Sequence, residues 1–139
     1  MSAKKKILAV DDDALSLGAL RQILVQKGYE VLVAHNGQQA LALLDSSSFD
    51  LFILDVAMPG MSGYDLCRRI RARPETENTP VIFLTAKALL MDIAEGQDAG
   101  SDLYLIKPIM AAKLLNMVGL FLTSDSPLTR RRRPATPTA

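Results

Sequence analysis

The chain has 139 residues, the size of a single domain, and 49% of them are hydrophobic, which is enough for a core without disulfides. Its net charge of +1 is uneven: residues 124–139 hold four arginines (Arg130 to Arg133) against one acid, so the remainder is slightly acidic, which argues against a nucleic-acid-binding surface. No apolar run reaches the roughly 20 residues that cross a bilayer, the basic N-terminus makes a poor signal peptide, and the single Cys67 cannot form an internal disulfide, so we expect a cytoplasmic protein.

Short apolar runs rich in β-branched residues alternate along the chain with longer stretches of helical spacing. In chain order we predict strand 7–10, helix 14–27, strand 29–34, helix 36–45, strand 49–55, helix 62–72, strand 80–85, helix 89–99, strand 103–106 and helix 109–122. Ser62 suits the N-cap of its helix, and Gly28 and Gly100 follow two helices as terminating glycines do.

This alternation of five strands with five helices predicts an α/β fold with a parallel sheet covered on both faces. Right-handed crossovers favour a doubly wound, flavodoxin-like sheet with strand order 2-1-3-4-5. In such sheets, ligands bind beyond the carboxyl ends of the strands, where the first and third strands lie side by side.

Polar and charged residues gather at these strand ends. The first strand runs into three consecutive carboxylates, the third ends at Asp55, the fourth at Thr85 and the fifth at Lys107. Adjacent carboxylates repel each other unless a cation neutralises them, and a cluster of oxygen ligands without His or Cys suits Mg²⁺. Each residue also has an ordinary explanation, since Asp13 could cap the next helix, Thr85 could be a plain strand residue and Lys107 could be solvated.

Four segments carry a resemblance to a known family: residues 7–13 (ILAVDDD), 54–63 (LDVAMPGMSG), 83–86 (FLTA) and 104–108 (YLIKP). With these motifs, residues 5–123 resemble the receiver domain of bacterial two-component response regulators, in the chemotaxis-regulator-like superfamily. We therefore expect a receiver domain over residues 1–123. Residues 124–139, rich in Ser, Thr, Pro and Arg, are expected to be a disordered basic tail or the start of a linker.

The resemblance implies that Asp55 is the phosphoryl acceptor, with a histidine kinase or phosphotransfer protein as donor. It further implies that Mg²⁺ is held by Asp12, by Asp11 through water, by Asp55 and by the backbone carbonyl of Ala57. On this interpretation the chain is not an enzyme acting on other molecules, because it only accepts and later loses its own phosphoryl group.

The same resemblance assigns the remaining site residues. Thr85, Ala86 and Lys107 would contact the phosphoryl group, and Pro108 would form a cis turn that aims the lysine inward. Thr85 and Tyr104 would form the switch, in which movement of the threonine makes room for the tyrosine ring. The surface formed by residues 89–99, 103–106 and 109–122 would then change shape.

The implied donor is the kinase, and the surface would be used by a downstream effector, by a fused output domain or by a second copy of the chain. Neither nucleic acid nor a membrane is expected to contact the domain itself. The segment Leu89-Leu90-Met91 is either a partner-binding patch or, for at least two of its three residues, ordinary packing against the sheet.

Two competing functions remain open from the sequence. The first is an aspartyl-phosphate phosphatase of the haloacid dehalogenase type, with Asp11 as nucleophile and Asp13 as general acid, although a late acidic pair and a cap insertion are missing. The second is a degenerate receiver that serves only for docking. Identification of the phosphorylated residue separates them, since the receiver uses Asp55 and the phosphatase Asp11.

Overall fold

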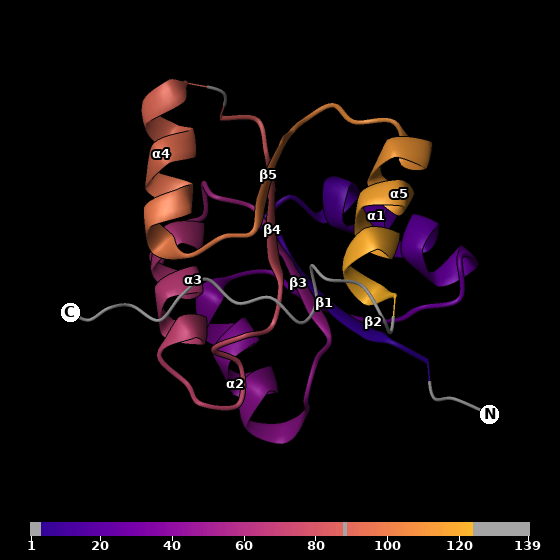
Figure 1. Ribbon diagram of the computed structural model, residues 1–139, viewed down its shortest axis with the longest axis horizontal. Coiled ribbons are helices and arrows are strands. Elements are labelled where there is room, and N and C mark those ends of the chain that lie inside the picture. Colours follow the sequence, from indigo (N-terminus) through magenta and orange to yellow (C-terminus); the bar gives the residue numbers. More distant parts are fainter. Residues whose placement is uncertain (1–3, 88, 124–139) are drawn as a thin grey trace.

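The computed structural model describes residues 4–87 and 89–123, which form a five-stranded parallel sheet with five helices (Figure 1). The elements are, in chain order, β1 (Lys6–Val10), α1 (Ala14–Gln26), β2 (Glu30–Ala34), α2 (Gly37–Ser46), β3 (Leu51–Leu54), α3 (Gly63–Arg71), β4 (Val81–Thr85), α4 (Leu90–Ala99), β5 (Leu103–Ile106) and α5 (Ala111–Leu122). The expectation of residues 124–139 as a disordered tail or linker lies outside the described residues.

The strand order is β2-β1-β3-β4-β5, as predicted, and every neighbouring pair is parallel. In this register Val10 of β1 lies beside Leu54 of β3, and Thr85 of β4 lies beside Ile106 of β5. The residues that follow these strands therefore emerge together at one edge of the sheet.

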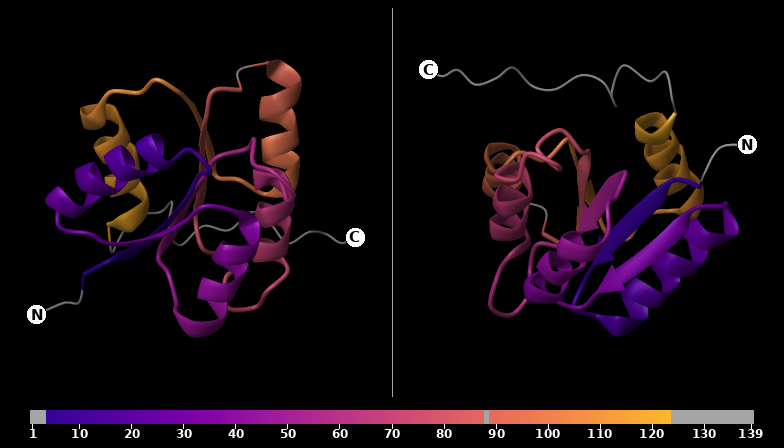
Figure 2. Two further views of the ribbon diagram at one scale, coloured as in Figure 1. Left: turned by 180° about the vertical axis from the view of Figure 1, so that it is seen from behind. Right: turned by 90° about the horizontal axis from the view of Figure 1, so that it is seen from below.

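Two layers of helices cover the sheet because successive strand residues point to opposite faces. In β3, Ile53 packs under α1 and α5, whereas Phe52 and Leu54 pack under α2, α3 and α4. Figure 2 shows the two groups of helices on either side of the strands. Each face has its own cluster of buried apolar side chains, and the two clusters give the edge residues a packed base.

Side-chain caps fix where three of the helices begin. Asp13, Asn36 and Ser62 each accept a hydrogen bond from a backbone N–H of the following turn, which leaves fewer amide groups unpaired. Gly28 and Gly100 both have a φ of 107°, the left-handed conformation that ends a helix and that side chains disfavour. The predicted bounds differ from the observed ones by one or two residues at element ends.

The start of α4 corrects one expectation. Leu89 is 66% exposed and Met91 is 72% exposed, so packing against the sheet does not explain at least two residues of the Leu89-Leu90-Met91 segment. Across residues 4–87 and 89–123, no helix is both long and apolar enough to span a membrane.

Candidate functional site

Three carboxylates meet where β1 and β3 end. The N–H of Asp55 donates to the carbonyl of Val10 (2.9 Å), which continues the ladder between the two strands and sets Asp55 beside the acidic run after β1. One oxygen from each of Asp11, Asp12 and Asp55 lies within 4.8 Å of the others. These are hard oxygen ligands on a preformed edge, the kind of set that holds a divalent cation such as Mg²⁺.

Asp11 is the buried member of this cluster, with only 4% of its surface exposed. Its Oδ2 accepts a 2.7 Å hydrogen bond from Lys107 Nζ, and its Oδ1 accepts a 2.9 Å bond from the N–H of Asp13. Lys107 Nζ also lies 3.4 Å from the hydroxyl of Ser16, on the first turn of α1. Sequence reasoning did not find Ser16, because its role depends on where the lysine points.

Asp55 is half-buried, and burial raises the pKa of its carboxyl above the ordinary value. The nearby negative charge of Asp11 raises that pKa further. A hydrogen bond from Thr85, the positive charge of Lys107 and a 2.8 Å bond from the N–H of Val56 act in the opposite direction without cancelling the increase. A cation at this position would offset the factors that raise the pKa of Asp55.

Thr85 and Lys107 come from adjacent strands and are linked through the backbone. Thr85 is 1% exposed, its hydroxyl accepts a 3.3 Å bond from the N–H of Lys87, and its carbonyl accepts a 2.8 Å bond from the N–H of Lys107. The Lys107–Pro108 peptide bond is cis, as the resemblance implied. The hydroxyl near Asp55 and the ammonium near Asp11 are therefore carried by one hydrogen-bonded strand pair.

The loop after β3 passes close beneath Asp55. The N–H of Gly63 donates to the carbonyl of Val56 (2.8 Å), and a Cβ atom at position 63 would collide with the carbonyl oxygen of Asp55. Ala57 and Ala86, which the resemblance places near the metal ion and the phosphoryl group, are both exposed at this edge.

Asp13 stands apart from the cluster. Its Oδ1 accepts a 3.1 Å bond from the N–H of Leu15, and its side chain is exposed, so its observed contact is the helix cap. Asp13 therefore does not join the carboxylate cluster formed by Asp11, Asp12 and Asp55.

Tyr104 is half-buried and packs against the apolar cluster beneath α3 and α4. Its hydroxyl lies 3.3 Å from the hydroxyl of Tyr64 on α3. The sequence analysis singled out Tyr104 and assigned nothing to Tyr64, whose contact depends on how α3 packs beside α4 and β5.

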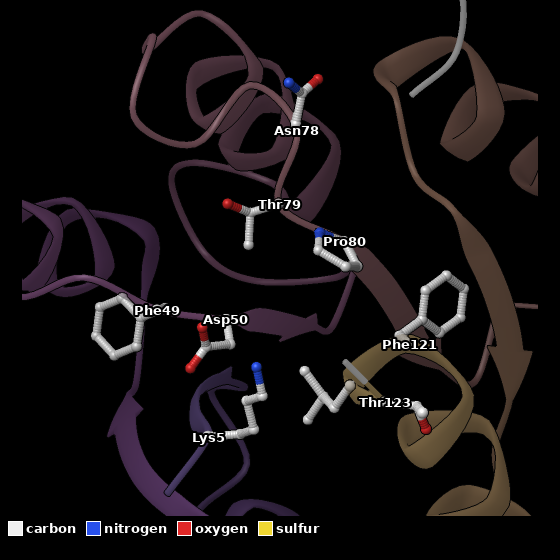
Figure 3. Close-up of a pocket in the computed structure, with 9 residues that line it drawn as sticks. Lys5, Phe49, Asp50, Asn78, Thr79, Pro80, Phe121 and Thr123 are labelled. Atoms are coloured by element: carbon white, nitrogen blue, oxygen red, sulfur yellow. The ribbon is translucent and has the colours of Figure 1, made fainter. Parts of the chain in front are cut away.

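Two hollows border the described part of the chain at opposite edges of the sheet. One of about 560 Å³ opens between α1 and α5, with Asp11, Asp55 and Lys107 in its wall. The other, of about 260 Å³, lies at the amino ends of the strands and is lined by residues that include Lys5, Asp50 and Thr123 (Figure 3). Only the first adjoins the carboxylate cluster.

Comparison with known proteins gives consistent results. A model of the response regulator receiver domain family matches residues 7–119. The transcriptional regulatory protein CpxR of Klebsiella pneumoniae is 44% identical over 117 residues, which cover 84% of this chain and 49% of that protein. The phosphate regulon transcriptional regulatory protein PhoB of Rhizobium meliloti is 38% identical over 122 residues, covering 88% of this chain and 54% of that protein. The chain thus spans about half the length of these curated relatives.

Solved structures agree. The chemotaxis protein CheY4 of Vibrio cholerae superposes with a TM-score of 0.80 at 34% identity, covering 84% of this chain and 97% of that one. The receiver domain of the sensor histidine kinase PA1611 from Pseudomonas aeruginosa, solved with a magnesium ion in its active-site cleft, gives a TM-score of 0.78 at 32% identity, covering 84% and 96%.

Proposed function

The chain belongs to the response regulator receiver domain family, and from that premise we propose that Asp55 accepts a phosphoryl group from a phosphohistidine on a partner protein. The observation that carries the proposal is the convergence of Asp11, Asp12 and Asp55, with Lys107 and Thr85 beside them, at the carboxyl edge of the sheet. A carboxylate oxygen of Asp55 forms the new bond to phosphorus while the bond from phosphorus to the imidazole nitrogen breaks. The imidazole leaves with that electron pair.

The donor set fits Mg²⁺ as the resident cation. Asp12, Asp55 and the carbonyl of Ala57 would hold it directly, and Asp11 would do so through water. When bound, the cation supplies positive charge that neutralises the carboxylates and the phosphoryl oxygens, which is the main requirement of phosphoryl transfer together with positioning. Burial and the neighbouring charge of Asp11 both raise the pKa of the Asp55 carboxyl, so a cation beside Asp55 would offset a cost that the site already carries.

The remaining residues orient the product and transmit its formation. The phosphoryl group adds a charge of about −1.5 to −2 and three acceptor oxygens at Asp55. Lys107 would shift from Asp11 toward one oxygen as a point charge, and the Thr85 hydroxyl and the backbone N–H of Ala86 would donate to others. The hydrogen bond from the backbone N–H of Lys107 to the backbone carbonyl of Thr85 would couple these movements. Tyr104, on β5, would hold its ring in the inward position that these movements favour.

The partners follow from the same chemistry. The donor is a sensor histidine kinase or a phosphotransfer protein, and the receiver acts only on its own phosphoryl group rather than turning over a separate substrate. The relatives CpxR and PhoB are described as transcriptional regulators, and the match covers only 49% and 54% of their lengths, which favours an output domain or effector that responds to the α4–β5–α5 surface. A second copy could bind the same surface, and the receiver itself would contact neither nucleic acid nor a membrane.

Acetyl phosphate offers a direct test. The wild-type chain, incubated with acetyl phosphate and Mg²⁺, should gain the mass of one phosphoryl group, and peptide mapping after chemical trapping should locate it at Asp55. Asp55→Asn should gain none, whereas Asp98→Asn, which alters an exposed acid on α4, should behave as wild type. An adduct at Asp11 would instead support the phosphatase alternative, and the absence of any adduct in folded protein would overturn the proposal.

A further inference from the structure

The ring of Tyr104 contacts residues of β4, α3 and α4 on the sheet face that α2, α3 and α4 cover. Phe83, its neighbour on β4, has its ring centre 5.8 Å away at an interplanar angle of 53°. Tyr64 on α3 approaches from the far end, with the two hydroxyl oxygens 3.3 Å apart, and Gly96 on α4 covers one edge of the ring. The ring is therefore turned toward the core.

The direction of the hydrogen bonds between these hydroxyls can be assigned. Tyr64 donates its hydroxyl proton to the backbone carbonyl of Asp92 over 2.8 Å. A tyrosine hydroxyl has one proton to donate, so the Tyr64 oxygen accepts from Tyr104. Two consecutive hydrogen bonds, from Tyr104 to Tyr64 and from Tyr64 to the Asp92 carbonyl, thus connect β5 through α3 to the first turn of α4. The surface of α4 adjoins β5.

Gly96 provides the room for this arrangement. A Cβ atom at position 96 would lie 2.8 Å from Cδ2 and 3.0 Å from Cε2 of Tyr104, and 3.3 Å from Cδ2 of Phe83. Contacts this short require the ring to move, since both neighbours belong to packed aromatic side chains. The inward position of the Tyr104 ring therefore depends on the Tyr64 hydroxyl, which accepts its hydrogen bond, and on the lack of a side chain at Gly96.

We propose that Tyr64 and Gly96 form a cradle whose own contacts hold the Tyr104 ring inward whether or not Asp55 carries a phosphoryl group, so that the α4–β5 surface of this chain is partly set in its switched form. The inference rests on the proposed function, because it concerns how strongly phosphorylation at Asp55 changes that surface. Tyr64 is a positioning residue, since it touches neither the acceptor nor the donor. Removing its hydroxyl leaves the ring free to turn outward and makes the inward position depend on the phosphoryl group.

The experiment measures the position of the ring rather than activity. Nuclear Overhauser contacts between the Tyr104 and Phe83 rings report the inward position in labelled protein, without and with Mg²⁺ and beryllofluoride as a phosphoryl mimic. Tyr64→Phe removes only the hydroxyl, and Gly96→Ala closes the cradle from the other side. Tyr29→Phe, on the opposite face of the sheet, and Gly18→Ala, in open space on α1, are the matched controls.

Wild type and both controls should show strong contacts between the two rings without the mimic. In Tyr64→Phe the inward-to-outward ratio should fall by roughly 2- to 12-fold, the range that one neutral hydrogen bond provides, and the mimic should restore it. Gly96→Ala should keep the contacts weak in both conditions. Full contacts in Tyr64→Phe without the mimic, or an outward ring in wild type, would overturn the inference.

Phosphoryl uptake measured on the same samples separates the two proposals. If Asp55 takes up the phosphoryl group in every variant but Tyr64→Phe leaves the position of the Tyr104 ring unchanged, the inference about the cradle is wrong and the proposed function stands. If the ring depends on Tyr64 while no phosphoryl group is gained at Asp55, the cradle stands and the proposed function is wrong. Circular dichroism confirms that each variant is folded before its spectrum is compared.

Discussion

A buried carboxylate needs a cation, and Asp11 has one in Lys107. The side chains of Asp11 and Lys107 are 6% and 25% exposed, and the 2.7 Å contact between them is the shorter of the lysine's two hydrogen bonds. The proposed Mg²⁺ would compete with the Lys107 ammonium for the Asp11 carboxylate. The proposed phosphoryl group on Asp55 would compete with Asp11 for the Lys107 ammonium. The lysine thus balances part of the negative charge that a bound divalent cation would also neutralise.

Replacing that lysine should expose the competition. Lys107→Ala leaves Asp11 buried without its cation, so the free energy of unfolding should fall by about 1–3 kcal/mol in the absence of Mg²⁺. Saturating Mg²⁺ should recover part of the loss. Denaturant titrations with and without Mg²⁺ measure both quantities, and Lys87→Ala, an exposed lysine two residues beyond Thr85, is the control. An equal loss in both conditions would contradict the expected exchange.

The carboxyl of Asp55 gives a pH-dependent prediction. Because its pKa is raised in the folded chain, its ionised form lowers folding stability at neutral pH. That cost disappears as the pH falls through the raised pKa toward the unfolded value. Asp55→Asn should therefore be more stable than wild type at neutral pH without metal, with the difference shrinking in acid.

Thermal unfolding of both proteins across pH provides the measurement. Added Mg²⁺ should stabilise wild type more than Asp55→Asn, because the variant lacks one proposed ligand. A variant that is less stable than wild type at neutral pH without metal would contradict the prediction.

The sequence was sufficient to bring the acids together but not to assign their contacts. Asp11, Asp12 and Asp55 follow parallel strands, so strand order alone sets their proximity. Ser16 and Tyr64 depend instead on where a lysine and a tyrosine point, which is decided by packing that no local pattern contains. The roles of the site residues remain predictions until the adduct is mapped.

At the scale of the elements, the helix starts were predicted to within two residues, and the largest difference falls at α5, which has no side-chain cap. Asp13 and Ser62 mark the starts of α1 and α3, and the prediction was within one residue of both. For α4 and α5 no side chain makes a cap hydrogen bond, and the predicted start of α5 at residue 109 precedes the observed Ala111. Without a cap the sequence leaves the first turn ambiguous.

The loop between β3 and α3 is the element most constrained by the site. Gly63→Ala should lower the free energy of unfolding by about 2–4 kcal/mol, because its Cβ would collide with the carbonyl oxygen of Asp55 and displace the acceptor. Phosphoryl uptake should fall as well, even in the folded fraction.

Gly119→Ala on α5 is the matched control. A Cβ atom there has nothing within 4 Å, so the substitution should raise the free energy of unfolding by about 0.5–1 kcal/mol, because it restricts the unfolded chain. Equal effects of the two substitutions, measured by chemical denaturation, would show that close approach at position 63 is not what constrains the loop.

At the scale of the whole molecule, the two edges of the sheet have different tasks. The carboxyl edge carries the charged cluster, whereas Arg71 secures the amino edge by donating to the carbonyls of Gly100, Thr76 and Thr79 and to the carboxylate of Asp102. The strand order explains this division, and the sequence predicted the order correctly. It did not predict Arg71, because its partners come from separate loops.

This division can be tested by substitution at the amino edge. Arg71→Met should cost about 2–4 kcal/mol of stability, since the carboxylate of Asp102 is only 14% exposed and loses this ion pair. Phosphoryl uptake per folded molecule should stay the same. Arg73→Met breaks a more exposed ion pair with Asp45 and should cost about 0–1 kcal/mol. A large loss of uptake in folded Arg71→Met would show that the edges are coupled.

The hollow at the amino edge has a practical consequence. Lys5 and Thr123 both line it, on the side of the sheet away from the carboxylates (Figure 3). Cys67, the single cysteine of the sequence, is fully buried, so a thiol introduced at position 5 or 123 would react with a dye or a bead before the native one does. A chain immobilised in this way would present its acidic edge outward, free for a phosphodonor delivered in flow.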